Sequence, residues 1–382
     1  MIYKQSVTSD SVVVTYSLFE AASGVREYHL MLEGTDYERS FQEQLEALHS
    51  AFAQYSAGEL KEATPVFKRY FLSDVANQAN LLSDAISEDT PCAVSVIQQA
   101  PLSGAKVSLW VCLQTQIVTG MIAEGLFEVT HNGYRHLWGV HDATTAAGAA
   151  EQTSLLFRDY MKQLEQSGCN LADHCLRTWL FVEHVDRNYL GVVNARNDIF
   201  DMQKLTADTH YIASTGIGGR SACPESLVRM DTYAVSGLRP EQIQYLYAPD
   251  HMNPTHEYGV SFERGTCVHY GDRRQVFISG TASIDNKGEI VFPGDIRKQT
   301  KRMWENVAAL LTEAGCSFDD LSQMIVYLRD PADYTIVRKL FEQKFPDVPQ
   351  VIVYAPVCRP GWLIEMECMA LKACRQDAYY AY

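Results

Sequence analysis

The chain has 382 residues, of which 47% are hydrophobic and 21% charged, and its formal net charge is −15. This length exceeds one ordinary domain and predicts two or three. The sequence holds no basic stretch to neutralise phosphates, which excludes a nucleic-acid binder, and no run of 18 apolar residues, which excludes a membrane-spanning helix.

The first predicted elements are an amphipathic helix at residues 40–60 and a strand with a following turn at residues 70–77. In the middle of the chain, a helix begins near Glu151 and stops at Gly168, and a strand follows it up to Val182. Glycine at the end of a helix is a common stop signal, so the pattern indicates helix, turn and strand in that order.

The last third of the chain has the clearest pattern. Alternating apolar positions predict strands, and an apolar stripe that includes Val307, Leu310 and Leu311 predicts a helix. The expected elements are a strand at 275–284, a helix at about 294–314 capped by Gly315, a strand at 323–328, a helix with Pro331 in its first turn, and strands at 351–357 and 362–371. A sheet with both helices on one face would bury these stripes.

The same order of elements recurs along the chain. A constant shift of 147 residues lays residues 151–182 on residues 298–329, and it matches Gly168 with Gly315 and Asp173 with Asp320. A shift of 256 residues brings YFLSDVAN, which ends at residue 77, onto VYLRDPAD. A register kept across a helix, a glycine stop and a strand indicates internal repeats.

We therefore predict an α/β protein made of three two-layer α+β repeats, at residues 1–114, 115–240 and 241–382. Each repeat would have one sheet face covered by helices and one bare face. Three bare faces can pack together around a pseudo-threefold axis, which predicts an intramolecular pseudo-trimer with clefts between the copies. Because this arrangement removes the need to assemble three chains, we expect a monomer or a weak dimer.

The third copy resembles the YjgF/Rid family over residues 247–373. The resemblance is carried by ISGTASID, GDIRKQT, AGCSFDDL, VYLRDPADY and LIEMECMA. It implies a trimer-like arrangement with ligand sites at the interfaces, and some members hydrolyse reactive enamines and imines. The deaminases of that family carry an arginine about fifteen residues before the first Glu of the last strand. Here that count reaches Gln350, which speaks against imine deamination.

More of the chain is similar to the chorismatases, single-chain relatives that hydrolyse the enolpyruvyl ether of chorismate. The similar segments are VFKRYFLSDVANQ, LRTWLF, NARNDIF, ASTGIGG, EYGVSFERG, ISGTAS and CRPGWLIEME, in that order. This resemblance implies release of pyruvate together with a hydroxybenzoate or a dihydroxycyclohexadiene carboxylate. It also implies that the chemistry needs neither metal nor other cofactor.

The chorismatase resemblance implies that Glu365 is the general acid and that Cys358, seven residues earlier, is a pocket residue. An apolar pocket would raise the pKa of such a carboxyl and suit it for protonating carbon. The period of a strand places Glu365 and Glu367 on one face. The alternatives are that Glu365 is a solvated strand residue or an ion-pair partner of Arg359. No histidine lies near Cys358 in the sequence, which favours a pocket-wall thiol over a nucleophile.

A dicarboxylate substrate needs arginine donors, because the net charge of the chain repels anions. The resemblance implies that Arg264 binds substrate and that Gly280 shapes the pocket, where the pair of Gly280 and Cys358 favours 3-hydroxybenzoate. Tyr258 is close enough in sequence to line the same pocket. Arg359 and Arg196 are further candidates, with a surface ion pair and a helix-end contact as their respective alternatives; for Gly280 the alternative is a bulge or close packing.

The three copies differ at the position of Glu365. The second copy has Arg229 there, and the first has Leu109 or Trp110, depending on the register. Loss of the acid from two copies predicts one active cleft per chain, formed largely by the third copy.

The sequence thus predicts a chorismatase-like hydrolase or lyase acting on a small anionic substrate. The alternatives are a Rid-type enamine or imine hydrolase, a small-molecule binder or a non-catalytic scaffold. Residues 1–14 lack the apolar core of a secretion signal, and ten scattered cysteines form no metal-binding pattern. We therefore expect a cytoplasmic protein without metal or cofactor.

Overall fold

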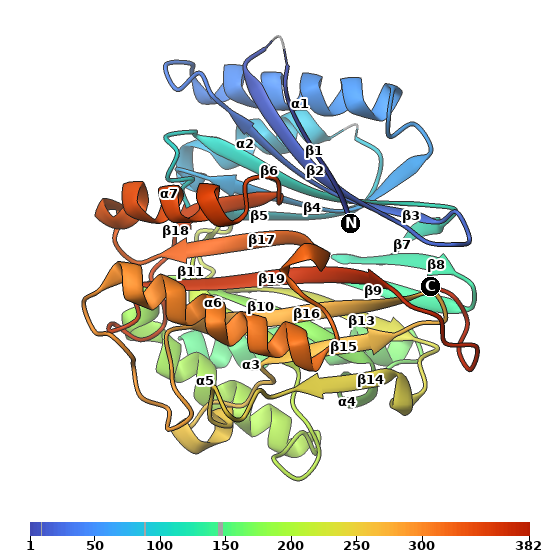
Figure 1. Ribbon diagram of the computed structural model, residues 1–382, viewed down its shortest axis with the longest axis vertical. Helices are drawn as coiled ribbons and strands as arrows, with labels where there is room; N and C mark the ends of the chain where they lie inside the picture. Colours follow the sequence, from blue (N-terminus) through green and yellow to red (C-terminus); the bar gives the residue numbers. More distant parts are fainter. Residues whose placement is uncertain (9, 88, 144–147) are drawn as a thin grey trace.

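The structure, a computed structural model, describes residues 1–8, 10–87, 89–143 and 148–382. Within them the chain forms three mixed sheets (Figure 1). The first copy comprises β1 (Ile2–Val7), β2 (Val12–Glu20), β3 (Arg26–Gly34), α1 (Phe41–Ala57), β4 (Ala63–Leu72), α2 (Val75–Ile86), β5 (Ala93–Gln98) and β6 (Val107–Thr115). The second comprises β7 (Val118–Ala123), β8 (Leu126–His131), β9 (Tyr134–Asp142), α3 (Ala149–Gln166), α4 (Leu171–His174), β10 (Cys175–Val182), α5 (Val185–Met202), β11 (Ala213–Gly218), β12 (Arg220–Ser221) and β13 (Val228–Ser236).

The third copy has the same plan, with short 3-10 turns added. It comprises η1 (Pro240–Gln242), β14 (Ile243–Leu246), η2 (Thr255–Tyr258), β15 (Gly265–His269), β16 (Arg273–Ala282), α6 (Ile296–Glu313), η3 (Phe318–Asp320), β17 (Leu321–Leu328), η4 (Pro331–Asp333), α7 (Tyr334–Lys344), β18 (Gln350–Tyr354) and β19 (Ile364–Ala373). The strand orders are β1-β2-β3-β6-β4-β5-β12, β7-β8-β9-β13-β10-β11 and β14-β15-β16-β19-β17-β18.

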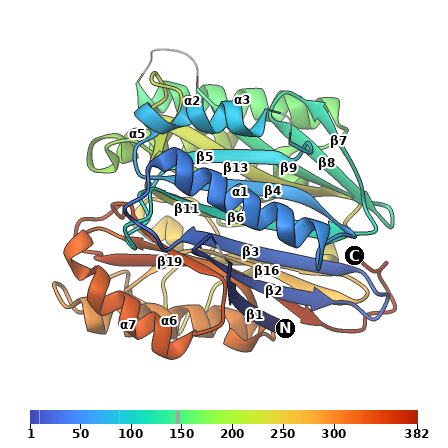
Figure 2. The ribbon, with the colours of Figure 1, turned by 90° about the horizontal axis from the view of Figure 1, so that it is seen from above.

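The three sheets therefore share one topology, in which the central strands β6, β13 and β19 correspond. In each copy one parallel pair is joined through a helix: β4 and β5 through α2, β10 and β11 through α5, and β17 and β18 through α7. The helices lie on the outside and the sheets face one another (Figures 1 and 2). This confirms the predicted α/β fold of three repeats packed as an intramolecular pseudo-trimer. The unit boundaries expected from the sequence stay predictions.

Aromatic side chains join the three sheets at the centre of the molecule. Phe67 of β4 stacks on Trp138 of β9 with ring centroids 4.9 Å apart, and Trp138 lies 4.5 Å from Tyr233 of β13. Tyr233 in turn contacts Phe277 of β16 at 5.1 Å. Large apolar rings on the bare face of each sheet thus form a shared core, because no sheet alone could remove them from water.

The sequence register between the second and third copies changes by one residue after the glycine stop. Val182, the last residue of β10, is opposite Gly218 and Val228 on the two neighbouring strands. The last residue of β17, Leu328, pairs in the corresponding way, and it lies 146 residues after Val182. The constant shift of 147 expected up to the end of the strand is therefore wrong. The cause is that α4 has four residues where η3 has three.

The elements of the third copy lie close to their expected positions. Helix α6 begins after Asp295, whose side chain accepts a hydrogen bond from Lys298 N, and Gly315 follows its end with a left-handed φ of 69°. Pro331 lies in the 3-10 turn η4, which leads directly into α7. In the described part of the chain, none of the helices is both long and apolar enough to cross a membrane.

Candidate active site

A pocket lies between the second and third copies. The space between its walls, open solvent at the mouth included, is about 500 Å³. It is lined by Tyr189, Arg196, Ser214, Gly216, Tyr258, Val260, Phe262, Arg264, Gly280, Ala282, Ile284, Cys358, Arg359, Trp362 and Glu365. The structure thus brings all seven residues named from the sequence to one pocket, although they come from segments up to 169 residues apart (365 minus 196).

Glu365 of β19 lies in this pocket, and only 4% of its surface is exposed. Burial raises the pKa of its carboxyl to about 8, and the charge of Glu367 acts in the same direction. Among the described residues Glu365 forms no ion pair, and Arg359 stacks instead on the rings of Tyr258 and Trp362, 4.4 and 4.9 Å from their centroids. Glu365 is therefore neither a solvated strand residue nor the ion-pair partner of Arg359.

Gly280 leaves room for this carboxyl. It lies at a bulge in β16, where the register against β19 shifts, and a Cβ at this position would overlap Glu365 Oε1. The second copy holds the bulge in place: Gly280 N donates to Thr215 Oγ1 (2.9 Å), and Ser214 N donates to Ser279 Oγ (2.9 Å). Bulges often re-aim side chains beside functional sites, and both alternatives for Gly280, bulge and pocket shape, apply here together.

Three arginines enter the pocket without a carboxylate partner among the described residues. Arg196 of α5 is 1% exposed, and its Nε and Nη2 atoms have no hydrogen-bond acceptor in the described chain. Arg264 donates from Nη2 to the carbonyl of Asn253 (3.0 Å), but its Nε is likewise without a partner. Burial lowers the pKa of Arg196. Since a buried unpaired cation is costly, this arrangement is suited to an anionic ligand that would complete it.

The pocket wall beside Glu365 is formed by a thiol and two tyrosines. Burial raises the pKa of the Cys358 thiol to about 12, and the charge of Glu365 adds to this. Such a thiol stays protonated at neutral pH, which argues against a nucleophile. Tyr189 packs against Gly216, where a Cβ would lie 2.8 Å from its ring. Tyr258 is close to two arginines, with Arg264 5.5 Å and Arg359 4.4 Å from its ring centroid.

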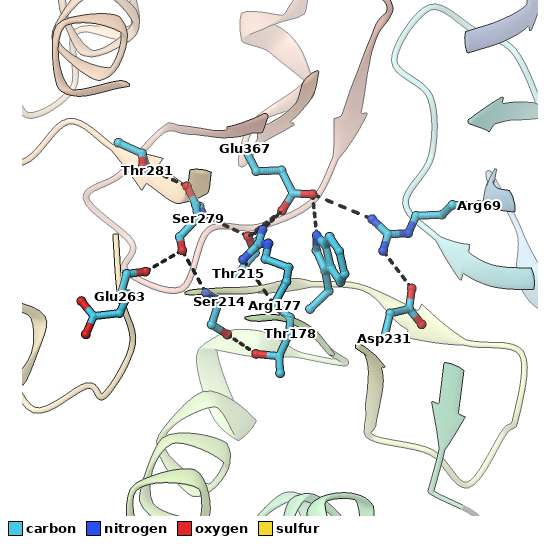
Figure 3. Close-up of polar contacts among 12 residues, drawn as sticks. Arg69, Arg177, Thr178, Ser214, Thr215, Asp231, Glu263, Ser279, Thr281 and Glu367 are labelled. Carbon is cyan, nitrogen blue, oxygen red and sulfur yellow. Dashed lines mark hydrogen bonds and ion pairs between the residues drawn. The ribbon is translucent and has the colours of Figure 1, made fainter. Parts of the chain in front are cut away.

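Glu367, two residues after Glu365, belongs to a buried charge network that joins all three copies (Figure 3). Its partners are Arg177 Nη2 (2.8 Å), Trp179 Nε1 (2.7 Å), Thr215 Oγ1 (2.5 Å) and Arg69 Nη1 (3.8 Å). Arg69 also pairs with Asp231 at 2.9 Å. Because Thr215 also accepts the hydrogen bond from Gly280, the network positions the bulge that faces Glu365.

The copies can be compared at the position of Glu365 through strand pairing. Glu365 is opposite the second-to-last residue of β17. The second-to-last residue of β10 is opposite Arg229, and that of β4 is opposite Ser108. Arg229 is as expected. The expectation of Leu109 or Trp110 in the first copy is wrong, because the chain between β4 and β6 is one residue shorter than the chain between β17 and β19: Leu72 is opposite Val107, and Leu328 is opposite Ile364.

A second cluster of possible ligand atoms is fully paired. Glu27, His29 and Cys112 place a carboxylate, an imidazole and a thiol within 4.8 Å of one another. Trp110 Nε1 can only donate, so His29 Nδ1 accepts its hydrogen bond (3.3 Å) and His29 Nε2–H donates to Glu27 Oε1 (2.9 Å). Arg273 contacts the other oxygen of Glu27 at 3.3 Å. The imidazole therefore has no free lone pair for a metal, and the cluster serves as a buried structural network.

Comparison with known proteins places the third copy in a family. The endoribonuclease L-PSP family model matches residues 266–372. A RutC family protein from Pyrococcus abyssi is 40% identical over 100 residues, covering 25% of this chain and 78% of that protein. The 3-aminoacrylate deaminase RutC of Acinetobacter baylyi is 30% identical over 97 residues, covering 25% of this chain and 77% of that protein. The chain belongs to the RutC family, and the predicted YjgF/Rid relationship is confirmed.

The fold of the whole chain has a solved counterpart. A chorismatase crystal structure aligns with a TM-score of 0.62 at 18% identity, covering 80% of this chain and 93% of that chain. The predicted chorismatase-type architecture, with YjgF/Rid-like units in one chain, is confirmed as a fold. At this identity the likeness concerns the fold alone.

Sequence reasoning missed several residues of the pocket, of which Tyr189 is the most informative. Tyr189 and Arg196 are seven residues apart on α5, which places them on one helix face, so this spacing could have identified Tyr189. Trp362 and Phe262 were hidden for another reason: they flank named residues in sequence, but only tertiary packing decides that they face the pocket.

Proposed function

We propose that this protein cleaves the enolpyruvyl ether of chorismate and releases pyruvate. The observation that carries the proposal is a buried carboxyl with a raised pKa, Glu365, in a pocket where Arg196, Arg264 and Arg359 lack carboxylate partners in the described chain. A protonated acid beside several cations suits a substrate that carries carboxylates and must be protonated on carbon. The fold shared with a chorismatase supports the same assignment.

In the proposed reaction, Glu365 donates its proton to the methylene carbon of the enol ether. The resulting oxocarbenium ion is captured by a water molecule, which loses a proton back to the Glu365 carboxylate. The hemiketal then collapses to pyruvate and the ring alcohol, so that one water is consumed for each ether cleaved. Loss of one water from the dihydroxycyclohexadiene carboxylate would yield a hydroxybenzoate, and we favour 3-hydroxybenzoate because of Gly280 and Cys358.

The pocket arginines would bind the substrate carboxylates, while Tyr258 holds two of these guanidinium groups by stacking. The apolar wall, which includes Val260, Ile284 and Trp362, would exclude bulk water from the cation intermediate. The pKa of Glu365 near 8 keeps it protonated at neutral pH, so activity is expected to fall as the pH rises through about 8.

The test is to mix purified protein with chorismate and follow pyruvate through lactate dehydrogenase. Wild type is expected to release pyruvate, and Glu365→Gln to lose at least about 100-fold in turnover, the usual minimum for a general acid. Glu151→Gln, an exposed glutamate on α3, is the matched control and should be as active as wild type. Chromatography of the ring product then distinguishes 3-hydroxybenzoate from the diene. Absence of pyruvate with folded wild type would contradict the proposal.

The second candidate function is hydrolysis of a small enamine or imine. It is favoured by the 30% identity of the third copy to a 3-aminoacrylate deaminase, and the same buried acid could protonate an enamine carbon. Against it, Gln350 lines the cleft with the first copy rather than the pocket of Glu365. Ammonia release from enzymatically generated 2-aminoacrylate, without pyruvate from chorismate, would favour this candidate. Lack of both activities would favour a binding protein or a scaffold.

A further inference from the structure

The clefts between copies differ at one pair of facing strand positions. In the pocket described above the pair is Ala282 on β16 and Glu365 on β19. The corresponding pair is Glu33 on β3 and Ser108 on β6 in the first copy, and Asp142 on β9 and Arg229 on β13 in the second. Each copy therefore keeps a carboxyl at this pair, but on different strands and with different neighbours.

In the second copy this carboxyl is neutralised. Arg229 Nη1 forms an ion pair with Asp142, and Ser221 donates a hydrogen bond to the same carboxylate. The short strand β12, which contains Ser221, pairs with β5 of the first copy. The carboxylate of Asp142 is thus paired within the protein itself.

In the cleft between the first and third copies, the carboxyl has no cationic partner within 4 Å in the described residues. Glu33 accepts a hydrogen bond from Ser108 Oγ (2.6 Å), and burial raises the pKa of its carboxyl. The cleft holds about 940 Å³, open solvent at its mouth included. Like the pocket that contains Glu365, this cleft holds a carboxyl with a raised pKa and no cationic partner in the described residues, but Glu33 is only partly buried and the cleft is larger.

The neighbouring copy completes both clefts in the same way. In the Glu365 pocket, α5 of the second copy presents Tyr189 and Arg196, seven residues apart on one face. In the other cleft, α7 of the third copy presents Tyr334 and Arg338, four residues apart on one face. Both helices are the second long helix of their copy, so the clefts share one building plan with different residues.

Arg338 has hydrogen-bonding capacity left for a ligand. Its Nε donates to Glu342 Oε1 (2.6 Å), and among the described residues its two terminal amino groups have no hydrogen-bond partner. Met31, Phe341 and Val351 form the apolar part of the wall. One guanidinium matches one carboxylate, and a ligand with a single carboxylate is repelled least by the strongly negative chain.

We propose that this cleft is a second ligand site, and that it takes a small hydroxylated aromatic monocarboxylic acid. The carboxylate binds Arg338 at the rim, the ring packs on Met31 and Phe341, and the hydroxyl hydrogen-bonds with Glu33 at the base. The inference concerns other residues than the proposed chorismate chemistry and does not depend on it.

The test uses the full chain labelled with 13C in the methionine methyl groups and 3-hydroxybenzoate as the probe. Met31 lines the second cleft and no methionine lines the Glu365 pocket, so the methyl signal of Met31, assigned with Met31→Leu, reports on the second site alone. Saturable movement of this signal is expected in wild type. An unmoved signal at millimolar probe would overturn the proposal.

Matched variants separate a specific site from loose association. Arg338→Ala is expected to weaken the Met31 titration by at least about tenfold, whereas Lys339→Ala, which removes the same charge from the next exposed residue of α7, should leave it unchanged. Arg264→Ala, in the other pocket, should also leave it unchanged. Equal losses for Arg338→Ala and Lys339→Ala would contradict the site. Benzoate, which lacks the hydroxyl, should bind to wild type more weakly than 3-hydroxybenzoate does. Because benzoate has no hydroxyl for Glu33 to bind, its affinity for Glu33→Leu should equal its affinity for wild type.

Discussion

Glu365 and Glu367 lie on the same face of β19, two residues apart and equally buried, yet their surroundings are opposite. Glu367 contacts two arginines, a tryptophan and a threonine, which bind its two oxygens. Glu365 has neither ion pair nor hydrogen bond among the described residues, and burial raises its pKa to about 8. The comparison teaches that one strand supplies both a carboxylate paired with residues of all three copies and a carboxyl without a partner among the described residues, which is the one we propose as the acid.

The largest expected effect comes from removing the paired carboxylate. Glu367→Leu leaves Arg177 and Arg69 buried with one partner fewer, and loss of one member of a buried charge network costs about 3–5 kcal/mol. Glu365→Gln replaces a protonated carboxyl by an amide of the same shape, which has no proton to lose in the unfolded state, so it should not lower the free energy of unfolding at pH 7. Urea unfolding of both variants measures the difference. Similar losses for the two variants would abolish the distinction between a structural and a reactive carboxyl.

The next effect concerns the space that Gly280 leaves for Glu365. Gly280→Ala places a Cβ where Glu365 Oε1 lies and must displace the carboxyl. A displacement of about 1 Å can cost about 100-fold in turnover, so pyruvate release from chorismate is expected to fall by that order. Gly120→Ala is the matched control, because a Cβ there meets nothing within 4 Å. Full activity of Gly280→Ala would mean that the carboxyl need not stay where the structure has it.

The unpaired carboxyl also makes stability depend on pH. Its pKa is raised from 4.5 to about 8 on folding, so the folded state holds a proton that the unfolded state has lost between these values. The contribution of the Glu365 carboxyl to the free energy of unfolding is therefore fully present below about pH 4.5. It is lost as the pH rises to about 8, at about 1.4 kcal/mol per pH unit.

The measurement is the difference in unfolding free energy between wild type and Glu365→Gln at several pH values. Glu263, whose pKa burial raises to about 7, contributes the same slope to both proteins and cancels in this difference. Wild type should lose stability relative to the variant as the pH rises from 5 to 8. A flat difference would show that Glu365 titrates normally.

The sequence predicted much of this arrangement, for identifiable reasons. Repeats and strand periodicity are local, so the three copies and the position of Glu365 on β19 could be derived from them. The partners of Glu367 could not, because Arg69 and Arg177 come from the two other copies and meet it only through tertiary packing. For the same reason, the sequence named the pocket arginines but could not tell that they lack acidic partners.

Strand register was the other limit. The extra residue of α4 and the connection between β4 and β6, which is one residue shorter than that between β17 and β19, each move a strand by one position, which exchanges the two faces of a sheet. A sequence shift that ignores them assigns a core residue, Leu109 or Trp110, where the structure has Ser108. The carboxyl of the first copy on β3 was missed because it lies on the strand beside the one compared.

The smallest effect on turnover is expected at Cys358, which borders Glu365 without being able to replace it. With its pKa raised to about 12, the thiol has almost no thiolate at pH 7, so Cys358→Ala should retain turnover within about tenfold. The variant enlarges the pocket beside the ring, so we expect the ratio of hydroxybenzoate to diene, measured by chromatography, to change more than the rate of pyruvate release. A loss of 100-fold in a folded variant would instead make Cys358 a participant in the chemistry, and the reactive role would then no longer rest on Glu365 alone.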